Sequence, residues 1–383
     1  DWLVCSSGDS VSVRTYQRFQ TGESYIQGDI YLAKRSMMTI MDRSVLYQIN
    51  SLEKPQKISG FLKEKGYSQQ NLVDLRKNEQ AICLNGTYVH MNQILTKGDI
   101  LTVYIQETES SEQIRPVKLP VTIVYEDEDL LVINKSAGMP IHPSRNNPDN
   151  SLGNALAWYF KEQNKPFVFR CINRLDRDTS GLTIVAKHAV SAAILGQMVR
   201  EKSIHGLEAQ GIHREYLAIV EGNMTVDVGV ISAPIARKED RCLRRVVDFQ
   251  KGDRAVTHYR VIATEVMDGI SRSLVALQLE TGRTHQIRVH MAYLGYPLVG
   301  DFLYNPTYVG NQIDRREDLE NKNGDVSGTE SGVRRKPYDI DRHALHAWKL
   351  SFPHPMTGEP MEFTAPLPPD MQRLIPEEAL PSV

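Results

Sequence analysis

A polar loop between two apolar stretches constrains the fold of this chain more than any other feature. The loop reads Asn173-Arg174-Leu175-Asp176-Arg177-Asp178-Thr179-Ser180-Gly181 and separates the apolar residues 167–172 from residues 182–186. Short apolar runs joined by a polar turn with a terminal glycine are typical of strands that meet at a loop. The sequence therefore predicts a sheet built around residues 173–181.

The loop also carries more charge than a turn requires. A turn needs only residues that tolerate unusual dihedral angles and satisfy their own backbone, such as Asn, Gly or Asp. Arg174 and Asp176 are two residues apart, so on an extended backbone their side chains project to the same side. They could serve one ligand together. The other interpretation is a solvated hairpin with incidental ion pairs.

Several segments resemble, in the same order, those of the RluA-like pseudouridine synthases, which isomerise uridine in ribosomal or transfer RNA. The matching segments are the Asp176 loop, Arg214-Glu215-Tyr216, residues 282–290 (Gly-Arg-Thr-His-Gln-Ile-Arg-Val-His) and Leu345-His346-Ala347. A single short match can arise by chance, whereas several in register are specific. The loop around Lys135 and His142 also matches, although Ser136 stands where the family usually has Pro. In the Asp176 loop, Asn173 stands where the family usually has His.

The resemblance implies a role for each matching residue. Asp176 is the catalytic residue, Tyr216 lies against the target base, and Arg288 pairs with Asp176. The pairing has a physical reason, because a carboxylate in a dry pocket tends to take up a proton and a guanidinium keeps it ionised. In the family the residue that matches Arg174 fills the gap left when the target nucleotide leaves its stack. The residues implied to contact RNA are Arg174, Thr179, Arg283, His285 and Leu345.

The implied reaction detaches uracil from ribose, lets the base rotate and reattaches it through C5, with no metal or redox cofactor. Metal binding is a rival interpretation because His285, His290, His343 and His346 supply imidazoles. However, two ligands on one helix need i,i+4 spacing, whereas His285 and His290 are five residues apart. A metal-dependent hydrolase and an RNA-binding protein with a decayed active site remain as alternatives.

The hydrophobic pattern predicts an α+β fold. Strands are expected at residues 121–125, 130–133, 214–222, 256–264, 273–279 and 345–352, and helices at residues 151–163, 188–201 and 285–294. The resemblance implies the pseudouridine synthase fold, a mixed, mainly antiparallel sheet with flanking helices and a central cleft.

The expected domains follow from changes in composition along the chain. Helical spacing followed by an Asn-Gly turn between β-rich residues resembles the small RNA-binding domain shared by a ribosomal small-subunit protein and several RNA-modifying enzymes. Its basic side chains are few, so a packed lid with weak RNA affinity is the alternative. The expected divisions are an N-terminal extension of uncertain role (1–45), the small domain (46–105), a linker (106–119), the catalytic domain (120–370) with a disordered insertion at 311–341, and a tail (371–383).

Composition limits the class of protein. A hydrophobic content of 41%, a charged content of 24% and a net charge of −2 are ordinary for a globular chain and argue against a nonspecific nucleic-acid coat. A local basic cluster at residues 237–245 could still contact RNA or protect a strand edge. No apolar stretch is long enough to span a membrane. We expect a cytoplasmic monomer with RNA as its partner and no obligate protein partner. The scattered cysteines (Cys5, Cys83, Cys171 and Cys242) predict reduced thiols.

Overall fold

The computed structural model describes residues 41–52, 54–145, 147–208, 211–239, 243–267, 269–309 and 340–379. Most of the expected N-terminal extension, nearly all of the expected insertion, Cys5 and Cys242 lie outside these residues. The described Cys83 and Cys171 are free thiols. None of the helices in the described ranges is both long and apolar enough to cross a bilayer.

The described elements are runs of consecutive strands separated by helices. The strands are β1 (Met41–Gln48), β2 (Gln56–Lys57), β3 (Ile82–Leu84), β4 (Thr87–Tyr88), β5 (Ile94–Leu95), β6 (Ile100–Glu107), β7 (Thr122–Glu126), β8 (Leu130–Lys135), β9 (Arg170–Cys171), β10 (Ser180–Ala186), β11 (His213–Glu221), β12 (Val228–Ser232), β13 (Ile235–Arg237), β14 (Arg245–Val247), β15 (Val256–Met267), β16 (Ile270–Leu279), β17 (Leu345–Pro353) and β18 (Pro360–Thr364). The helices are α1 (Ile58–Glu64), α2 (Gln69–Lys77), α3 (Leu152–Glu162), α4 (Ala189–His205), α5 (Gln286–Tyr293), α6 (Pro306–Val309) and α8 (Pro369–Gln372).

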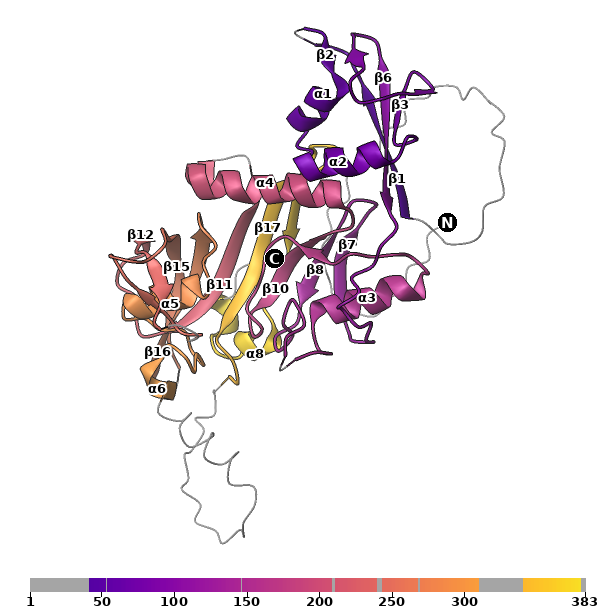
Figure 1. Cartoon of the computed structure of the whole chain (residues 1–383). Helices are drawn as coiled ribbons and strands as arrows, with labels where there is room; N and C mark the ends of the chain where they lie inside the picture. The colour runs from indigo at the N-terminus through magenta and orange to yellow at the C-terminus, as the bar shows by residue number, and fades with distance from the viewer. Residues whose placement is uncertain are drawn as a thin grey trace.

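A 10-stranded sheet forms the centre of the molecule (Figure 1). Its strand order is β12-β15-β16-β11-β17-β10-β8-β7, with β18 paired to β17 and β9 to β10. Strand pairs in the described part of this sheet are antiparallel except β10–β17. The predicted α+β class with a mixed, mainly antiparallel sheet is therefore confirmed.

The parallel pair β10–β17 brings two of the matching segments together. Ser180 lies opposite His346, and Gly181 lies opposite Ala347. Gly181 has a φ of +108°, and a Cβ atom there would collide with the backbone of Ala347. Only glycine allows this combination of dihedral angle and close approach. The terminal glycine of the loop thus sets the distance between the Asp176 loop and the start of β17.

Helices cover both faces of the sheet. Helix α5 buries Ile287 and Met291 in the cluster that contains Tyr216 and Leu345. Helix α3 packs in a second cluster over β8, and α4 packs Leu195 against β8, β10 and β17. The expected helices are confirmed. Their apolar residues recur at helical spacing, and that pattern identified them.

The small domain contains a four-stranded sheet, β1-β6-β3-β4, with α1 and α2 beside it. Strand β1 begins at Met41 and pairs along its whole length with β6, which ends at Glu107. The domain is thus longer at both ends than the expected residues 46–105. In β1 Val45 is buried, whereas Leu46 is 65% exposed. Such a weak alternation of apolar and polar residues hid the strand in the sequence.

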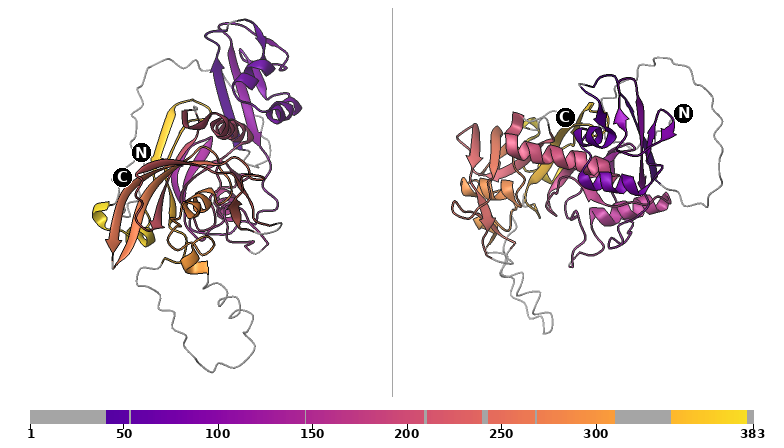
Figure 2. Two further views of the ribbon diagram at one scale, coloured as in Figure 1. Left: turned by 90° about the vertical axis from the view of Figure 1, so that its left-hand side faces the viewer. Right: turned by 45° about the horizontal axis from the view of Figure 1, so that its top comes forward.

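Helix α4 joins the small domain to the catalytic domain (Figures 1 and 2). Its residues Val190 and Ile194 belong to the hydrophobic core of the small domain. Glu107 accepts a hydrogen bond from the backbone N–H of Ala189 at 2.9 Å, at the first turn of α4. The other carboxylate oxygen of Glu107 accepts one from Arg170 at 2.9 Å. A side chain that ends β6 therefore caps the helix on which the domain rests.

The segment expected to be a linker is attached to the catalytic domain after Glu107. The backbone N–H of Ser111 donates to the Phe167 carbonyl at 3.1 Å, and that of Val117 donates to the Asn154 carbonyl at 3.1 Å. Ile114 packs into the cluster over β8. The polar, proline-containing composition predicted the lack of regular structure, but these contacts hold the segment in place.

Candidate active site

Lys135 supports the Asp176 loop from one side. Its buried ammonium donates hydrogen bonds to the carbonyls of Ser136 (2.8 Å), Met139 (2.9 Å) and Arg177 (3.0 Å). Burial lowers the pKa of Lys135 to about 7, while three carbonyl oxygens match the three N–H donors of its charged form. The conformation of the loop around Arg177 thus depends on a residue from the end of β8.

The segment before β17 supports the loop from the other side. Arg342 donates to the carbonyl of Asp178 at 3.1 Å and is itself held by Asp370 at 2.6 and 2.9 Å. The Thr179 hydroxyl and Nε2 of His343 are 2.8 Å apart, and Ser180 Oγ is 2.9 Å from Nδ1 of His346. These contacts fix the C-terminal half of the loop.

Asn173 completes the support at the beginning of the loop. Its buried side chain accepts a hydrogen bond from the backbone of Ile184 at 2.9 Å and donates one to the Leu182 carbonyl at 3.3 Å. A side-chain amide provides one acceptor and two donors, so it satisfies both backbone groups at once. The residue at the position where the family usually has His therefore connects the loop to β10.

Asp176 and Arg288 are hydrogen-bonded at 3.1 Å, as the resemblance implied. The Asp176 side chain is 26% exposed and the Arg288 side chain 9%. Arg288 also binds Asp301 through two hydrogen bonds of 2.7 and 2.8 Å. Two parallel N–H···O bonds of this kind fix a guanidinium in its plane as well as in position. Arg288 is thus anchored by a buried carboxylate and offers its remaining edge to Asp176.

Asp301 and Tyr304 were not identified in the sequence. Asp301 is fully buried, and the ring centre of Tyr304 lies 5.0 Å from the Arg288 guanidinium carbon. Gly300 precedes them with a φ of +71°, where a Cβ atom would collide with the Arg342 backbone. The sequence signal for these two residues is the Gly300-Asp301 pair in a turn after α5. The pair could not be recognised as part of the site, because its position depends on the contact between Gly300 and the Arg342 backbone, which no spacing rule predicts.

Tyr216 lies beside this group in a largely apolar setting. It is buried in one cluster with Leu175, Ile287 and Leu345. Burial raises the pKa of its hydroxyl, and Arg214 donates a hydrogen bond to the same hydroxyl. Tyr216 and Leu345 therefore form an apolar surface close to Asp176, the arrangement expected for residues that contact a flat base.

The other predicted RNA-contacting residues are more dispersed. Arg174 is exposed on the loop, and Arg283 is partly exposed, with its guanidinium 3.4 Å from Asp253. His285 Nε2 lies 3.8 Å from Asp176. Thr179 is buried and bonded to His343, so its contacts here are structural. An RNA contact by Thr179 stays a prediction.

The histidines considered as metal ligands have other partners. His290 is buried, with Nδ1 2.8 Å from the Thr257 hydroxyl and Nε2 2.9 Å from the Ala233 carbonyl. The described residues include a group whose ligand atoms are close enough together to hold a metal ion, formed by Asp127, Asp129 and His354. There Arg43 binds Asp129 at 2.8 Å, which makes this group part of the contact between the small domain and the sheet.

Comparisons with known proteins identify the family of this chain. A family model described as RNA pseudouridylate synthase matches residues 129–293. The "Uncharacterized RNA pseudouridine synthase YjbO" of Bacillus subtilis is 38% identical over 321 residues, which cover 84% of this chain and 99% of that protein. The chain belongs to the RNA pseudouridine synthase family.

Further relatives of this pseudouridine synthase are similar over most of their length. The "Ribosomal large subunit pseudouridine synthase D" of Xanthomonas campestris is 37% identical over 314 residues, 81% of this chain and 84% of that protein. The solved structure of "Human RNA Pseudouridylate Synthase Domain Containing 1" has 27% identity and a TM-score of 0.47, and covers 67% of this chain and 87% of that one. The expected RluA-like family and the isomerase activity on uridine in RNA are confirmed.

Proposed function

We propose that this enzyme converts uridine to pseudouridine in ribosomal RNA and that Asp176 is its catalytic residue. The observation that carries the proposal is the chain of contacts from Asp176 through Arg288 to the buried Asp301. Because Asp301 is buried, Asp176 is the carboxylate of this chain of contacts that a substrate can reach. Ribosomal RNA is supported by relatives whose names specify the large ribosomal subunit; transfer RNA remains the other substrate implied by the sequence resemblance.

The proposed roles follow from burial and position. Asp176 acts on the target uridine, and Arg288 holds the carboxylate in place through the hydrogen bond between them. Tyr216 and Leu345 lie against the flat face of the uracil. The exposed Arg174 occupies the space that the extruded nucleotide leaves in the RNA. The reaction as proposed needs no metal or redox cofactor.

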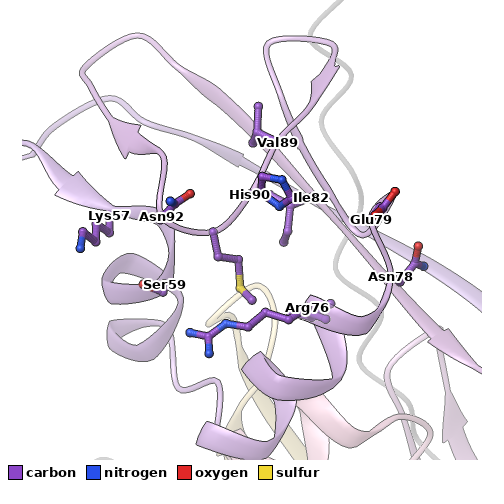
Figure 3. A pocket seen from close by; sticks show the side chains of 11 residues that line it. Lys57, Ser59, Arg76, Asn78, Glu79, Ile82, Val89, His90 and Asn92 are labelled. Atoms are coloured by element: carbon purple, nitrogen blue, oxygen red, sulfur yellow. The ribbon is translucent and has the colours of Figure 1, made fainter.

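A second RNA contact is proposed on the small domain. A pocket with a volume of about 320 Å³ lies between its helices and its sheet (Figure 3). Its lining includes the cations Lys57 and Arg76, the carboxylate of Glu79, the ring of His90 and the apolar Met91. The two cations next to an apolar surface suit single-stranded RNA, where phosphates and unstacked bases alternate. The packed-lid alternative predicts that Arg76→Glu leaves RNA affinity unchanged, whereas an RNA contact predicts weaker binding.

The cellular setting remains a prediction that follows from the proposed substrate. A ribosomal substrate would place the enzyme in the cytoplasm, where ribosomes are assembled in bacteria. We also propose that it acts as a monomer without an obligate protein partner. Sedimentation of the active enzyme with and without ribosomal RNA tests the second point.

The catalytic assignment is tested by tritium release from ribosomal RNA labelled at C5 of uridine. Asp176→Asn should bind the RNA with wild-type affinity and release no tritium, because an amide can neither carry the charge nor act as a nucleophile. Asp178→Asn, a change in the same loop whose side chain pairs with Arg177, is the matched control and should stay active. Measurable turnover by Asp176→Asn contradicts the assignment, and inhibition by a chelator contradicts the metal-free reaction.

A further inference from the structure

Tyr304 links the active site to strand β14 through its hydroxyl. The backbone N–H of Arg245 donates to this hydroxyl at 2.8 Å, and Nδ1 of His285 lies 2.8 Å from it. Burial raises the pKa of Tyr304 to about 12, so the phenol keeps its proton at neutral pH. The phenol can therefore donate its one proton to Nδ1 of His285 while its oxygen accepts from Arg245.

The state of the His285 ring follows from these contacts. Burial lowers the pKa of His285, and the charge of Arg288 lowers it further, while Asp176 opposes them. The neutral ring carries its proton on one nitrogen, and an Nδ1 that accepts a bond leaves that proton on Nε2. Nε2 lies 3.8 Å from the Asp176 carboxylate, which is too far for a hydrogen bond. In this tautomer the Nε2–H faces the site, and the described residues place no acceptor within hydrogen-bond distance of it.

We propose that His285 is a directed hydrogen-bond donor whose Nε2–H, fixed by the positioning residue Tyr304, binds an oxygen atom of the target nucleotide beside Asp176. The substrate named in this inference rests on the proposed function, whereas the tautomer of His285 can be measured without any substrate. It gives Tyr304 a role distinct from packing, since the hydroxyl determines which ring nitrogen carries the proton.

The backbone at His285 supports the same conclusion. His285 has a φ of 59° and a ψ of 19°, the left-handed region, at the N-terminal cap of α5. A residue other than glycine in this region is strained and persists only where its surroundings determine it. The backbone there is held by a hydrogen bond from the N–H of Val289 to the His285 carbonyl at 2.9 Å. The strained conformation aims the imidazole at Asp176 and Tyr304 together.

The first test reads the tautomer directly and needs no RNA. Nitrogen-15 NMR of histidine-labelled enzyme at pH 7.5 should show His285 with a protonated Nε2 and an unprotonated Nδ1. Tyr304→Phe removes only the hydroxyl and should convert this signal to a mixture of tautomers. A wild-type ring protonated on Nδ1, or an unchanged tautomer in folded Tyr304→Phe, overturns the proposal even if the enzyme is a ribosomal RNA synthase.

The second test compares two substitutions of His285 in single-turnover tritium release from labelled ribosomal RNA. The amide nitrogen of His285→Gln can reach the place of Nε2, whereas that of His285→Asn reaches only the place of Nδ1. Losing one hydrogen bond of about 1 to 1.5 kcal/mol corresponds to roughly a tenfold loss in rate. His285→Gln should therefore be at least about tenfold faster than His285→Asn. Equal rates, or a faster His285→Asn, would show that Nε2 is not the donor.

Discussion

Arg288 contacts two carboxylates that differ sharply in burial. Asp301 is fully buried and accepts two of its hydrogen bonds, while Asp176 accepts one at the edge of the site. An isolated buried charge costs far more than a paired one, so Asp301 and Arg288 stabilise each other in the interior. The more exposed Asp176 accepts the bond from Arg288 through Oδ2, so its Oδ1 is not bonded to Arg288. This difference supports the proposal that Asp176 rather than Asp301 is the reactive group.

Substitution of Arg288 should therefore affect stability and rate together. Arg288→Ala leaves the buried Asp301 without its partner, a change that typically costs about 3 to 5 kcal/mol in the free energy of unfolding. Arg288→Lys keeps the charge but loses the planar pair of donors, so it should be impaired to a lesser degree. Urea unfolding and single-turnover rates provide the measurements. Full activity in Arg288→Ala would contradict the pairing with Asp176.

For single residues, the sequence predicted some members of the candidate site and missed others. Asp176, Tyr216 and Arg288 lie in segments with specific motifs, and the structure brings them together. Asp301 and Tyr304 lie in a turn whose path depends on Gly300 and on the backbone of Arg342. A partner set by such a long-range contact has no local pattern. The support of the loop by Lys135 was missed for the same reason.

The connection between β10 and β17 depends on neutral histidines. His346 is buried between the Ser180 hydroxyl and the Ala365 carbonyl, and burial lowers its pKa to about 4. Its pKa in the folded chain is thus below the ordinary value of 6.5. A group of this kind stabilises the fold above about pH 6.5, and the stabilisation is lost as the pH falls towards 4.

The pH dependence gives a prediction for this strand pair. Between pH 7 and pH 4 the wild type should lose roughly 3 kcal/mol more unfolding free energy than His346→Gln, which has no imidazole to protonate. Urea titrations at several pH values measure the difference. His90→Gln, a change at an exposed histidine of the small domain, is the control and should follow the wild type. Parallel curves for wild type and His346→Gln would show that His346 is not the sensitive group.

Elements with strong periodicity were predicted well. The alternation of Val275, Leu277 and Leu279 and the helical spacing of Ile287 and Met291 correspond to buried positions in one core. Strands that are short or weakly alternating, such as β1 and the pair β13–β14, were not distinguished. Their stability comes from pairing with a partner strand, and pairing has no signature within the strand itself.

The whole molecule depends on α4, because both domains pack against it. Its first turn is capped by Glu107, and Ile194 is buried in the small domain while Leu195 is buried in the catalytic domain. Composition led us to expect a domain boundary near residue 106. The packing of α4 against both domains was not expected, although its apolar residues do not gather on one face, as burial against two partners requires.

A charge introduced at Ile194 should separate the domains. Ile194→Asp removes a buried side chain, at a cost of about 2 to 5 kcal/mol, and places a carboxylate in the contact. Calorimetry should then show two unfolding transitions, with weaker RNA binding and a nearly unchanged single-turnover rate at saturating RNA. Ile204→Asp, the same change at a position of α4 that is 72% exposed, should behave as the wild type. Unfolding of Ile194→Asp in a single transition would contradict a domain contact through this residue.

The pairing of Ser180 with His346 also has a consequence for the order of biosynthesis. Ser180 and His346 are 166 positions apart in the chain. The Asp176 loop, which ends next to Ser180, is also held by contacts with Arg342 and His343. A ribosome delivers the chain from its N-terminal end, and domains begin to fold as they emerge. The small domain and α4 can therefore be in place while the Asp176 loop still lacks its support. With the RNA contact proposed for the small domain, a nascent chain would bind RNA before it could modify it, and a chain that ends before β17 would lack the support of the Asp176 loop.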